Sequence, residues 1–266
     1  MKKFFVFLIV ITITFSNKVC ALDISASSAV LINEETKVVI YEKNAYKKMP
    51  MASTTKIMTA ICAIENMNTN IPIKVDDKAV GIEGSSIYLE KGEIITLKEL
   101  LYGMMLNSGN DAATAIAIAV GGSVENFCAM MNICAKNCGA VNTNFTNPSG
   151  LYDDNHYTTA YDLALITAHA MKNPLFKDIV SKKQMKISKG NGVRYLKNHN
   201  KLLGMYEGCT GVKTGYTKKC GRCLVSAAKR GGKNFQKIPE GLSLCYFNGI
   251  LTGQNIAKNG CVNIIK

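Results

Sequence analysis

Hydrophobic residues recur along this chain with two different periodicities, which predict strands near both ends with helices between them. The apolar runs 30–32 and 38–40 flank the polar segment 33–37, which predicts a β-hairpin. Residues 208–215 and 222–229 predict a second hairpin, and alternate positions of the latter run belong to opposite faces of a strand.

Between these hairpins, apolar residues recur at the spacing of helices. Residues 111–120 are almost all Ala, Ile and Val, which indicates a helix buried on every side. Ser123 is expected to cap the next helix and Gly139 to end it. Thr159 and Asp162 resemble a capping box with Asp in place of the usual Glu. We predict helices over residues 51–66, 97–106, 111–120, 123–137 and 159–173.

The first 21 residues predict a signal peptide rather than a folded element. Two lysines at positions 2–3 precede the apolar run 4–14, and the small residue Ala21 ends a segment like a signal-peptidase site. The apolar run is short for a bilayer span, so cleavage is favoured over an uncleaved anchor. Asn17 stands where a lipoprotein signal needs an apolar residue. We therefore expect an exported protein that acts at the cell wall or the outer face of the cytoplasmic membrane.

The charge of the chain narrows its partners. The formal net charge is +13 over 266 residues. A basic exported protein is attracted to polyanions such as wall polymers or anionic lipid headgroups, which predicts a peripheral wall or membrane association. The sequence has no nucleic-acid-binding motif, and export argues against such a partner.

The ten cysteines invite a metal or redox interpretation that the spacing does not support. Cys134 and Cys138 form one close pair, and Cys220 and Cys223 form another. A zinc site needs two matching pairs, or one pair with spaced histidines, and no such set is evident. We expect the cysteines to be small buried residues, and no metal or organic cofactor is implied.

Three short motifs that carry chemistry follow one another along this scaffold. They are Ser53-Thr54-Thr55-Lys56, Ser108-Gly109-Asn110 and Lys213-Thr214-Gly215. Alone, each has an ordinary interpretation as a helix cap with a surface lysine, a turn and a strand end. Their order matters more, because they fall at a helix start, in a loop between helices and on a strand. Together they predict a catalytic site.

The residue types explain the chemistry of such a site. A serine hydroxyl is a poor nucleophile until a neighbouring base takes its proton. A lysine can do this only when neutral, so burial and a nearby positive charge must lower its usual pKa of about 10.4. One helical turn places Lys56 beside Ser53, and Lys213 can supply the positive charge. A Ser–His pair stays an alternative, although no histidine lies in a nucleophile-elbow sequence. The histidines are His156, His169 and His199.

Longer stretches around the motifs resemble the penicillin-binding proteins and serine β-lactamases, and within them the D-alanyl-D-alanine carboxypeptidases. The resemblance runs over about residues 25–230. The stretches that carry it are residues 51–60, 106–113, 145–151, 156–162 and 211–217.

The resemblance implies the roles of the reacting groups. Ser53 would attack the penultimate D-Ala carbonyl of a peptidoglycan stem peptide and release the terminal D-Ala. Lys56 would be the base, and Ser108 would relay a proton to the leaving amine. Water would then hydrolyse the acyl-enzyme. Penicillin and other β-lactams would acylate Ser53 as slow substrate mimics.

The resemblance also implies the substrate-binding groups. Asn110 would hydrogen-bond the substrate amide and hold the lysine base. Lys213 and Thr214 would bind the terminal carboxylate, with Gly215 completing the motif on the substrate-binding strand. The backbone N–H of Tyr216 and that of the nucleophile would form the oxyanion hole.

The fold implied is of the α/β (α+β) class, like that of β-lactamases and transpeptidases. An antiparallel sheet would be built from both chain ends, with the two N-terminal strands pairing with the later hairpin. Helices would flank it, and an all-helical lobe would cover roughly residues 60–170. We expect the catalytic domain to span residues 22–230.

Two alternatives stay open. A serine β-lactamase of one class needs a second carboxylate base on a loop before the third motif, whereas residues 144–162 resemble the carboxypeptidase-type loop. An inactive protein that binds penicillin or peptidoglycan is the other alternative, and the end of the chain motivates it.

Residues 231–266 depart from the expected pattern and suggest a truncation or an altered reading frame. The family continues with an apolar strand after residue 229, but residues 232–239 are polar and contain Pro239. A possible strand follows at residues 242–247. A lost strand would expose a sheet edge and remove part of the core.

Overall fold

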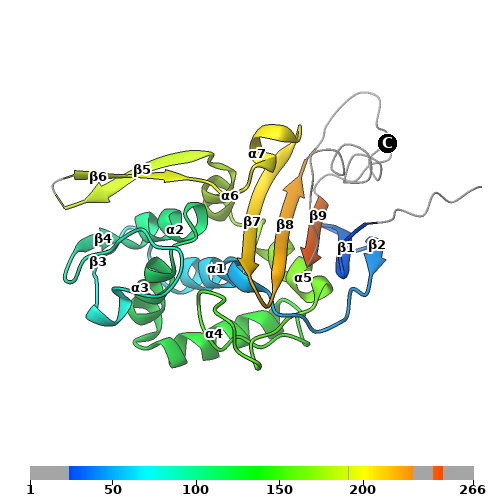
Figure 1. Cartoon of the computed structure of the whole chain (residues 1–266), viewed down its shortest axis with the longest axis horizontal. Coiled ribbons are helices and arrows are strands. Elements are labelled where there is room, and N and C mark those ends of the chain that lie inside the picture. Colours follow the sequence, from blue (N-terminus) through cyan, green and yellow to red (C-terminus); the bar gives the residue numbers. More distant parts are fainter. Residues whose placement is uncertain (1–23, 191, 230–241, 248–266) are drawn as a thin grey trace, which may run out of the picture. The chain divides into compact units, whose positions relative to one another are not determined.

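The sheet that supports the structure is built from both ends of the described chain (Figure 1). The computed structural model describes residues 24–190, 192–229 and 242–247. Five strands are hydrogen-bonded in the order β2-β1-β9-β8-β7, and every neighbouring pair is antiparallel. Their bounds are Ser28–Asn33 (β1), Val39–Lys43 (β2), Cys209–Thr217 (β7), Gly221–Ala228 (β8) and Leu242–Phe247 (β9). All elements described below belong to the unit Ser25–Ile250.

Strand β9 corrects one expectation about this sheet. The sequence predicts that the N-terminal strands pair directly with the later hairpin, but β9 lies between β1 and β8. Cys245 of β9 is opposite Val30 on one side and Val225 on the other. The possible strand at residues 242–247 is therefore confirmed, and it occupies the place where a missing strand was expected. The polar run 232–239 lies outside the described residues.

The domain boundaries given by the sequence stay predictions. Residues 1–21, the expected signal peptide, lie outside the described residues, as do residues 248–266. The expected boundary at residue 230 falls before β9, which is hydrogen-bonded within the main sheet.

Five helices follow the predicted pattern, two short helices at residues 174–181 and 202–205 were not predicted, and side-chain caps mark the starts of four of the seven described helices. Thr96 and Glu99 form a reciprocal capping box at the start of one helix, and Ser123 caps another as predicted. Gly139 follows the latter helix with a φ of 84°. The helices are Lys56–Asn66 (α1), Leu97–Leu106 (α2), Asn110–Gly121 (α3), Val124–Asn137 (α4), Ala160–Ala170 (α5), Pro174–Ser181 (α6) and Leu202–Met205 (α7).

The capping box predicted at α5 is only half formed. The Thr159 hydroxyl accepts a hydrogen bond from the Asp162 N–H, as expected. The Asp162 carboxylate instead accepts from the Asn142 N–H and the Thr143 hydroxyl, because a neighbouring loop reaches it. The helix also ends at Ala170, and a second helix, α6, begins at Pro174.

Two small two-stranded antiparallel sheets have no counterpart in the predicted pattern. One pairs Pro72–Lys74 (β3) with Ile94–Thr96 (β4), and the other pairs Gln184–Lys189 (β5) with Gly192–Lys197 (β6). The alternation of apolar and polar residues is weak in these strands, because charged residues occupy many positions. In the second pair only Ile187, Arg194 and Leu196 are buried. A buried arginine reads as polar in a hydrophobic pattern.

Helix α1 occupies the centre of the unit (Figure 1). It packs against α2, α3, α4, α5 and α6, and its residues 56–63 are all buried. The short 3₁₀ helix Ala52–Thr55 (η1) immediately precedes it and packs against β7 and β8. The fold thus places the start of α1 between the edge strand of the sheet and the helical lobe.

Among the described residues, no single helix is long and apolar enough to cross a bilayer. Helices α3 and α4 have that length and composition only when taken together, and they bend by 85° where they meet.

Candidate active site

The first motif lies on a tight turn that ends in the buried helix α1. Ser53 is in η1, where the Thr54 hydroxyl donates to the Met51 carbonyl at 2.6 Å. Ala52, before it, has a left-handed φ of 47°. Lys56 is the first residue of α1, and its Nζ lies 3.1 Å from the Ser53 Oγ. The sequence predicts this proximity, although the serine stands in a 3₁₀ turn rather than in the α-helix itself.

The amine of Lys56 is enclosed by neutral acceptors. Its Nζ donates to the Asn110 Oδ1 at 2.7 Å and to the Ser149 carbonyl at 2.6 Å. The Lys56 side chain is 0% exposed. Burial lowers its pKa well below the usual value, the positive charge of Lys213 lowers it further, and Asp111 opposes the shift. A neutral amine has two N–H groups for these two acceptors, which leaves its lone pair for the Ser53 hydroxyl proton.

The second motif connects α2 to α3. Ser108 is buried and has a left-handed φ of 60°, and Asn110 is the first residue of α3. The Asn110 Nδ2 donates to the Glu83 carbonyl at 2.5 Å, and its backbone N–H donates to the Ser85 carbonyl at 2.7 Å. Because Nδ2 is committed to a carbonyl, the amide can present only its Oδ1 to Lys56.

The third motif lies on β7, directly against the nucleophile turn. A Cβ placed on Gly215 would lie only 3.0 Å from the Ser53 backbone N, so glycine allows the close approach. Lys213 is 2% exposed, and its Nζ donates to the Thr214 carbonyl at 3.0 Å. Burial lowers the pKa of Lys213 to about 7. Tyr216, next on the strand, is 62% exposed.

The structure therefore brings the three motifs to one place. Ser53, Lys56 and Asn110 are joined by direct hydrogen bonds, and Gly215 touches the backbone of the same turn. Lys213 is close enough to Lys56 to lower its pKa. The remaining predicted residues are close in sequence to these contacts, with Thr214 and Tyr216 next to Gly215 and Ser108 two residues before Asn110.

The loop 145–151 supplies a contact that the motifs do not reveal. Its Ser149 carbonyl accepts from Lys56, and Gly150, with a φ of 87°, lies so close that a Cβ there would be 1.9 Å from the Ala52 carbonyl oxygen. The Asn147 Oδ1 accepts from the backbone N–H groups of Gly150 and Leu151. The Asn-Pro-Ser-Gly sequence predicts a turn here, but no local pattern predicts that this turn contacts Lys56.

His156 supports the nucleophile turn and is not the base. Its Nδ1 accepts from the Thr146 N–H at 3.1 Å, so the proton resides on Nε2, which donates to the Thr55 Oγ1 at 2.8 Å. The Thr55 hydroxyl in turn donates to the Ala52 carbonyl. Burial lowers the pKa of His156 to about 4, against the opposing negative charge of Asp153.

The other two histidines have different surroundings. His169 lies at the surface, with its Nε2 at 2.6 Å from Glu65. The backbone N–H of His199 donates to the Leu106 carbonyl. Burial and the charge of Lys213 lower the pKa of His199. No described contact joins any of the three histidines to the Ser53 hydroxyl, so the geometry favours lysine as the base.

The acidic residues of segment 144–162, which leads from α4 into the first turn of α5, are committed to local hydrogen bonds. Asp153 accepts from the Asn155 N–H, Asp154 from the Tyr152 hydroxyl, and Asp162 from the 142–143 segment. None of these contacts, within the described chain, presents a carboxylate to Ser53. Among all residues that the structure describes, no group of three or more His, Cys, Asp or Glu side chains could hold a metal ion.

Comparisons with known proteins agree with this geometry. A family model described as D-alanyl-D-alanine carboxypeptidase matches residues 14–238. The chain is 39% identical over 225 residues to D-alanyl-D-alanine carboxypeptidase DacF of Bacillus subtilis, covering 82% of this chain and 58% of that protein. It is also 37% identical over 228 residues to a D-alanyl-D-alanine carboxypeptidase of a Streptomyces species, covering 79% and 78%. The chain thus spans 58% of the length of the Bacillus relative.

Solved structures give the same result at the level of the fold. A mutant of the Streptomyces K15 DD-transpeptidase superposes with a TM-score of 0.81 at 32% identity, covering 91% of this chain and 98% of that one. A D-alanyl-D-alanine carboxypeptidase from Mycobacterium tuberculosis superposes with a TM-score of 0.80 at 30% identity, covering 87% and 86%. The α/β fold expected from the sequence, with its antiparallel sheet and helical lobe, is confirmed.

Proposed function

Since the chain belongs to the D-alanyl-D-alanine carboxypeptidase family, we propose that it is a serine DD-carboxypeptidase that removes the terminal D-Ala from peptidoglycan stem peptides. One observation carries the proposal. The Lys56 amine is buried among neutral acceptors with its third position directed at the Ser53 hydroxyl. That arrangement produces a neutral base beside a serine, which acyl transfer requires.

Acylation begins with proton transfer from Ser53 to Lys56. The Ser53 oxygen attacks the carbonyl carbon of the penultimate D-Ala, and the C–N bond to the terminal D-Ala breaks. Ser108 relays to the departing amine the proton that Lys56 took from Ser53, so that D-Ala leaves neutral at nitrogen and Lys56 is neutral again. A positioned base contributes about 10²–10⁴-fold to such a step.

Charge develops on the carbonyl oxygen during this attack. The backbone N–H groups of Ser53 and Tyr216 are the proposed donors to it. The close approach of β7 to the nucleophile turn at Gly215 supports this assignment. Loss of one such donor typically costs about 10²–10³-fold in rate.

Lys213 and Thr214 are the proposed binding groups for the terminal carboxylate. The chain buries Lys213 without a carboxylate partner among the described residues, so an incoming carboxylate would supply the missing counter-charge. The pKa of Lys213 near 7 in the free protein makes this recognition weaken as the pH rises through neutrality. Asn110 would hydrogen-bond the substrate amide from its position beside Lys56.

The acyl-enzyme is proposed to be resolved by water, and the same serine is proposed to react with penicillin and related β-lactams. A β-lactamase is less well supported, since the carboxylates of residues 144–162 are engaged locally. The similarity to the Streptomyces K15 DD-transpeptidase motivates a second candidate, in which an amine rather than water accepts the acyl group. Adding an acceptor amine to the assay separates the two.

The proposed place of action is outside the cytoplasmic membrane, where peptidoglycan lies. The basic N-terminal segment 1–21 supports export by a signal peptide. The net charge of +13 supports a peripheral association with anionic wall polymers or lipid headgroups.

D-Ala release from a peptide that ends in D-Ala-D-Ala tests the proposal. We expect release by the wild-type protein and none by Ser53→Ala, with fluorescent penicillin labelling only the former. A β-lactamase would instead turn over a chromogenic cephalosporin rapidly. A folded wild type, verified by circular dichroism, that releases no D-Ala would leave only a binding function.

A further inference from the structure

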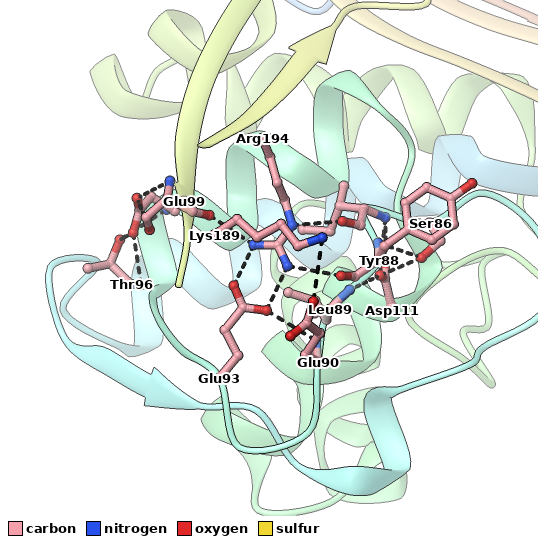
Figure 2. Close-up of polar contacts among 12 residues, drawn as sticks. Ser86, Tyr88, Leu89, Glu90, Glu93, Thr96, Glu99, Asp111, Lys189 and Arg194 are labelled. Carbon is pink, nitrogen blue, oxygen red and sulfur yellow. Dashed lines mark hydrogen bonds and ion pairs between the residues drawn. The ribbon is translucent and has the colours of Figure 1, made fainter. Parts of the chain in front are cut away.

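Arg194 is a buried cation that the proposed reaction does not use. It lies on β6, and its side chain is 6% exposed. Its guanidinium pairs with the carboxylate of Glu93, also 6% exposed, through both terminal nitrogens (Figure 2). Its Nε donates to the Ile87 carbonyl at 2.8 Å, and its Nη2 donates to the Tyr88 carbonyl at 2.9 Å. The fork thus holds two consecutive carbonyls of one loop.

Asp111 binds the N–H groups of the same loop. Its carboxylate accepts from the Ile87 N–H at 3.1 Å, from the Leu89 N–H at 3.0 Å and from the Ser86 hydroxyl at 2.6 Å. Figure 2 shows Arg194 and Asp111 both directed at this loop. A cation therefore fixes the carbonyls and an anion fixes the amides of a segment that contains Tyr88 in the left-handed region, with a φ of 58°.

The other end of this loop holds Asn110. The carbonyls of Glu83 and Ser85 accept the side-chain and backbone N–H groups of Asn110. Gly84 lies between them with a φ of 95°, and a Cβ there would be 2.7 Å from the Asn110 Nδ2. These contacts leave the Asn110 Oδ1 directed at the Lys56 amine. The segment 83–89 therefore connects the guanidinium to the catalytic lysine through a single amide side chain.

The hairpin that carries Arg194 is itself anchored. Ser188 on β5 donates from its N–H and its hydroxyl to the Glu99 carboxylate at the start of α2. The Arg194 Nη1 also donates to the Ser188 carbonyl at 2.8 Å. The guanidinium is thus fixed relative to α2, whose other end leads into the second motif.

We propose that Arg194 is a positioning residue for acylation, which acts through segment 83–89 to orient Asn110 against Lys56. The inference rests on the proposed function, since it concerns the same reaction. A buried ion pair is by itself weak evidence for stability, because an apolar pair of similar volume often serves as well. The specific feature is the fork on two loop carbonyls, which neither a lysine nor an apolar side chain can reproduce.

The test is a double-mutant cycle between Arg194 and Asn110. We would measure the acylation rate with fluorescent penicillin for wild type, Arg194→Lys, Asn110→Ala and the double variant. Saturation labelling would give the number of reactive sites, so that each rate refers to folded molecules. We expect Arg194→Lys to acylate roughly tenfold to a hundredfold more slowly than wild type. In the Asn110→Ala background the same change should alter the rate less than about twofold.

A second pair of variants covers the case in which Arg194→Lys does not fold. Arg194→Met with Glu93→Leu removes both buried charges, whereas Lys91→Met with Asp77→Leu removes an ion pair whose side chains are 75% and 59% exposed. The first should slow acylation per reactive site, and the control should leave it unchanged.

Three results would overturn the inference. Arg194→Lys could acylate at the wild-type rate per site, or it could slow both backgrounds by the same factor, which would make its effect independent of Asn110. A wild type that penicillin does not label would overturn both this inference and the proposed function. A wild type that is labelled, together with an equally fast Arg194→Lys, would overturn the positioning role alone.

Discussion

Lys56 and Arg194 are both buried cations, but their surroundings give them opposite properties. Arg194 is matched by the Glu93 carboxylate, and its guanidinium holds a loop in place. Lys56 is matched only by neutral acceptors, with a second cation, Lys213, nearby. Within the described chain, no carboxylate forms an ion pair with Lys56. Glu93 compensates the buried charge of Arg194, which therefore has a structural role, whereas burial among neutral acceptors beside a second cation favours the neutral form of Lys56, which can act as a base.

Replacing the lysine with an arginine should break this distinction most severely. A guanidinium at this position would keep its proton at any accessible pH, so Lys56→Arg should lower the acylation rate by about 10³-fold or more. Fluorescent-penicillin labelling over time measures the rate, with circular dichroism to verify folding. Retention of a tenth of the wild-type rate would show that position 56 is not the base.

Giving Lys56 a carboxylate partner should keep its amine charged, as the guanidinium of Arg194 is. In Asn110→Asp, a carboxylate would replace the neutral Oδ1 that lies 2.7 Å from the amine. The pKa of Lys56 would rise, so acylation at neutral pH should fall by about 10²-fold and recover as the pH increases. The measurement is the acylation rate against pH. Asn110→Ala is the control, since it should lose rate without recovering at high pH.

Removing the counter-charge of Arg194 should cost stability instead of producing a base. Arginine does not lose its proton, so Glu93→Gln would leave a buried charge without its partner and should cost about 3–5 kcal/mol. Urea unfolding measures this loss. Asp77→Asn, which breaks a pair with side chains 75% and 59% exposed, should change the stability by less than about 1 kcal/mol. Equal losses in the two variants would contradict the comparison.

His156, like Lys56, is a buried basic group whose pKa is lowered by burial. Burial holds its pKa at about 4, below the ordinary value of 6.5. Between these values the unfolded chain binds a proton that the folded chain does not. The contribution of neutral His156 to the free energy of unfolding is therefore complete above pH 6.5. It is lost as the pH falls toward 4, and the loss amounts to at most about 3 kcal/mol.

The difference in stability between wild type and His156→Gln isolates this group, because the other titrations are common to both proteins. The wild type should lose its advantage over the variant as the pH falls through that window. A difference that does not depend on pH would show that His156 is not held neutral.

The two buried cations also differ in how far the sequence reveals them. Ser53, Lys56, Asn110 and Lys213 belong to short motifs whose residue types are dictated by acyl transfer, so their meeting could be predicted. Five of the seven described helices were predictable for a related reason, since caps such as Ser123 and Thr159 act within a few residues.

Contacts made between distant segments were not predictable. Arg194 meets Ile87 from 107 residues away, and Ser149 meets Lys56 from 93 residues away through a main-chain carbonyl that any residue could supply. Strand β9 gave only a weak signal, and its place between β1 and β8 is fixed by the sheet as a whole. Local patterns record caps and catalytic residue types, whereas long-range hydrogen bonds appear only in the fold.

The protonation state of Lys56 tests the central claim most directly. Lysine side chains labelled with ¹³C at Cε report their own protonation by NMR, and Lys56→Arg identifies the signal that belongs to position 56. The account predicts a neutral amine at a pH where surface lysines, with a usual pKa of about 10.4, are still charged. A Lys56 signal that titrates together with the surface lysines would contradict it.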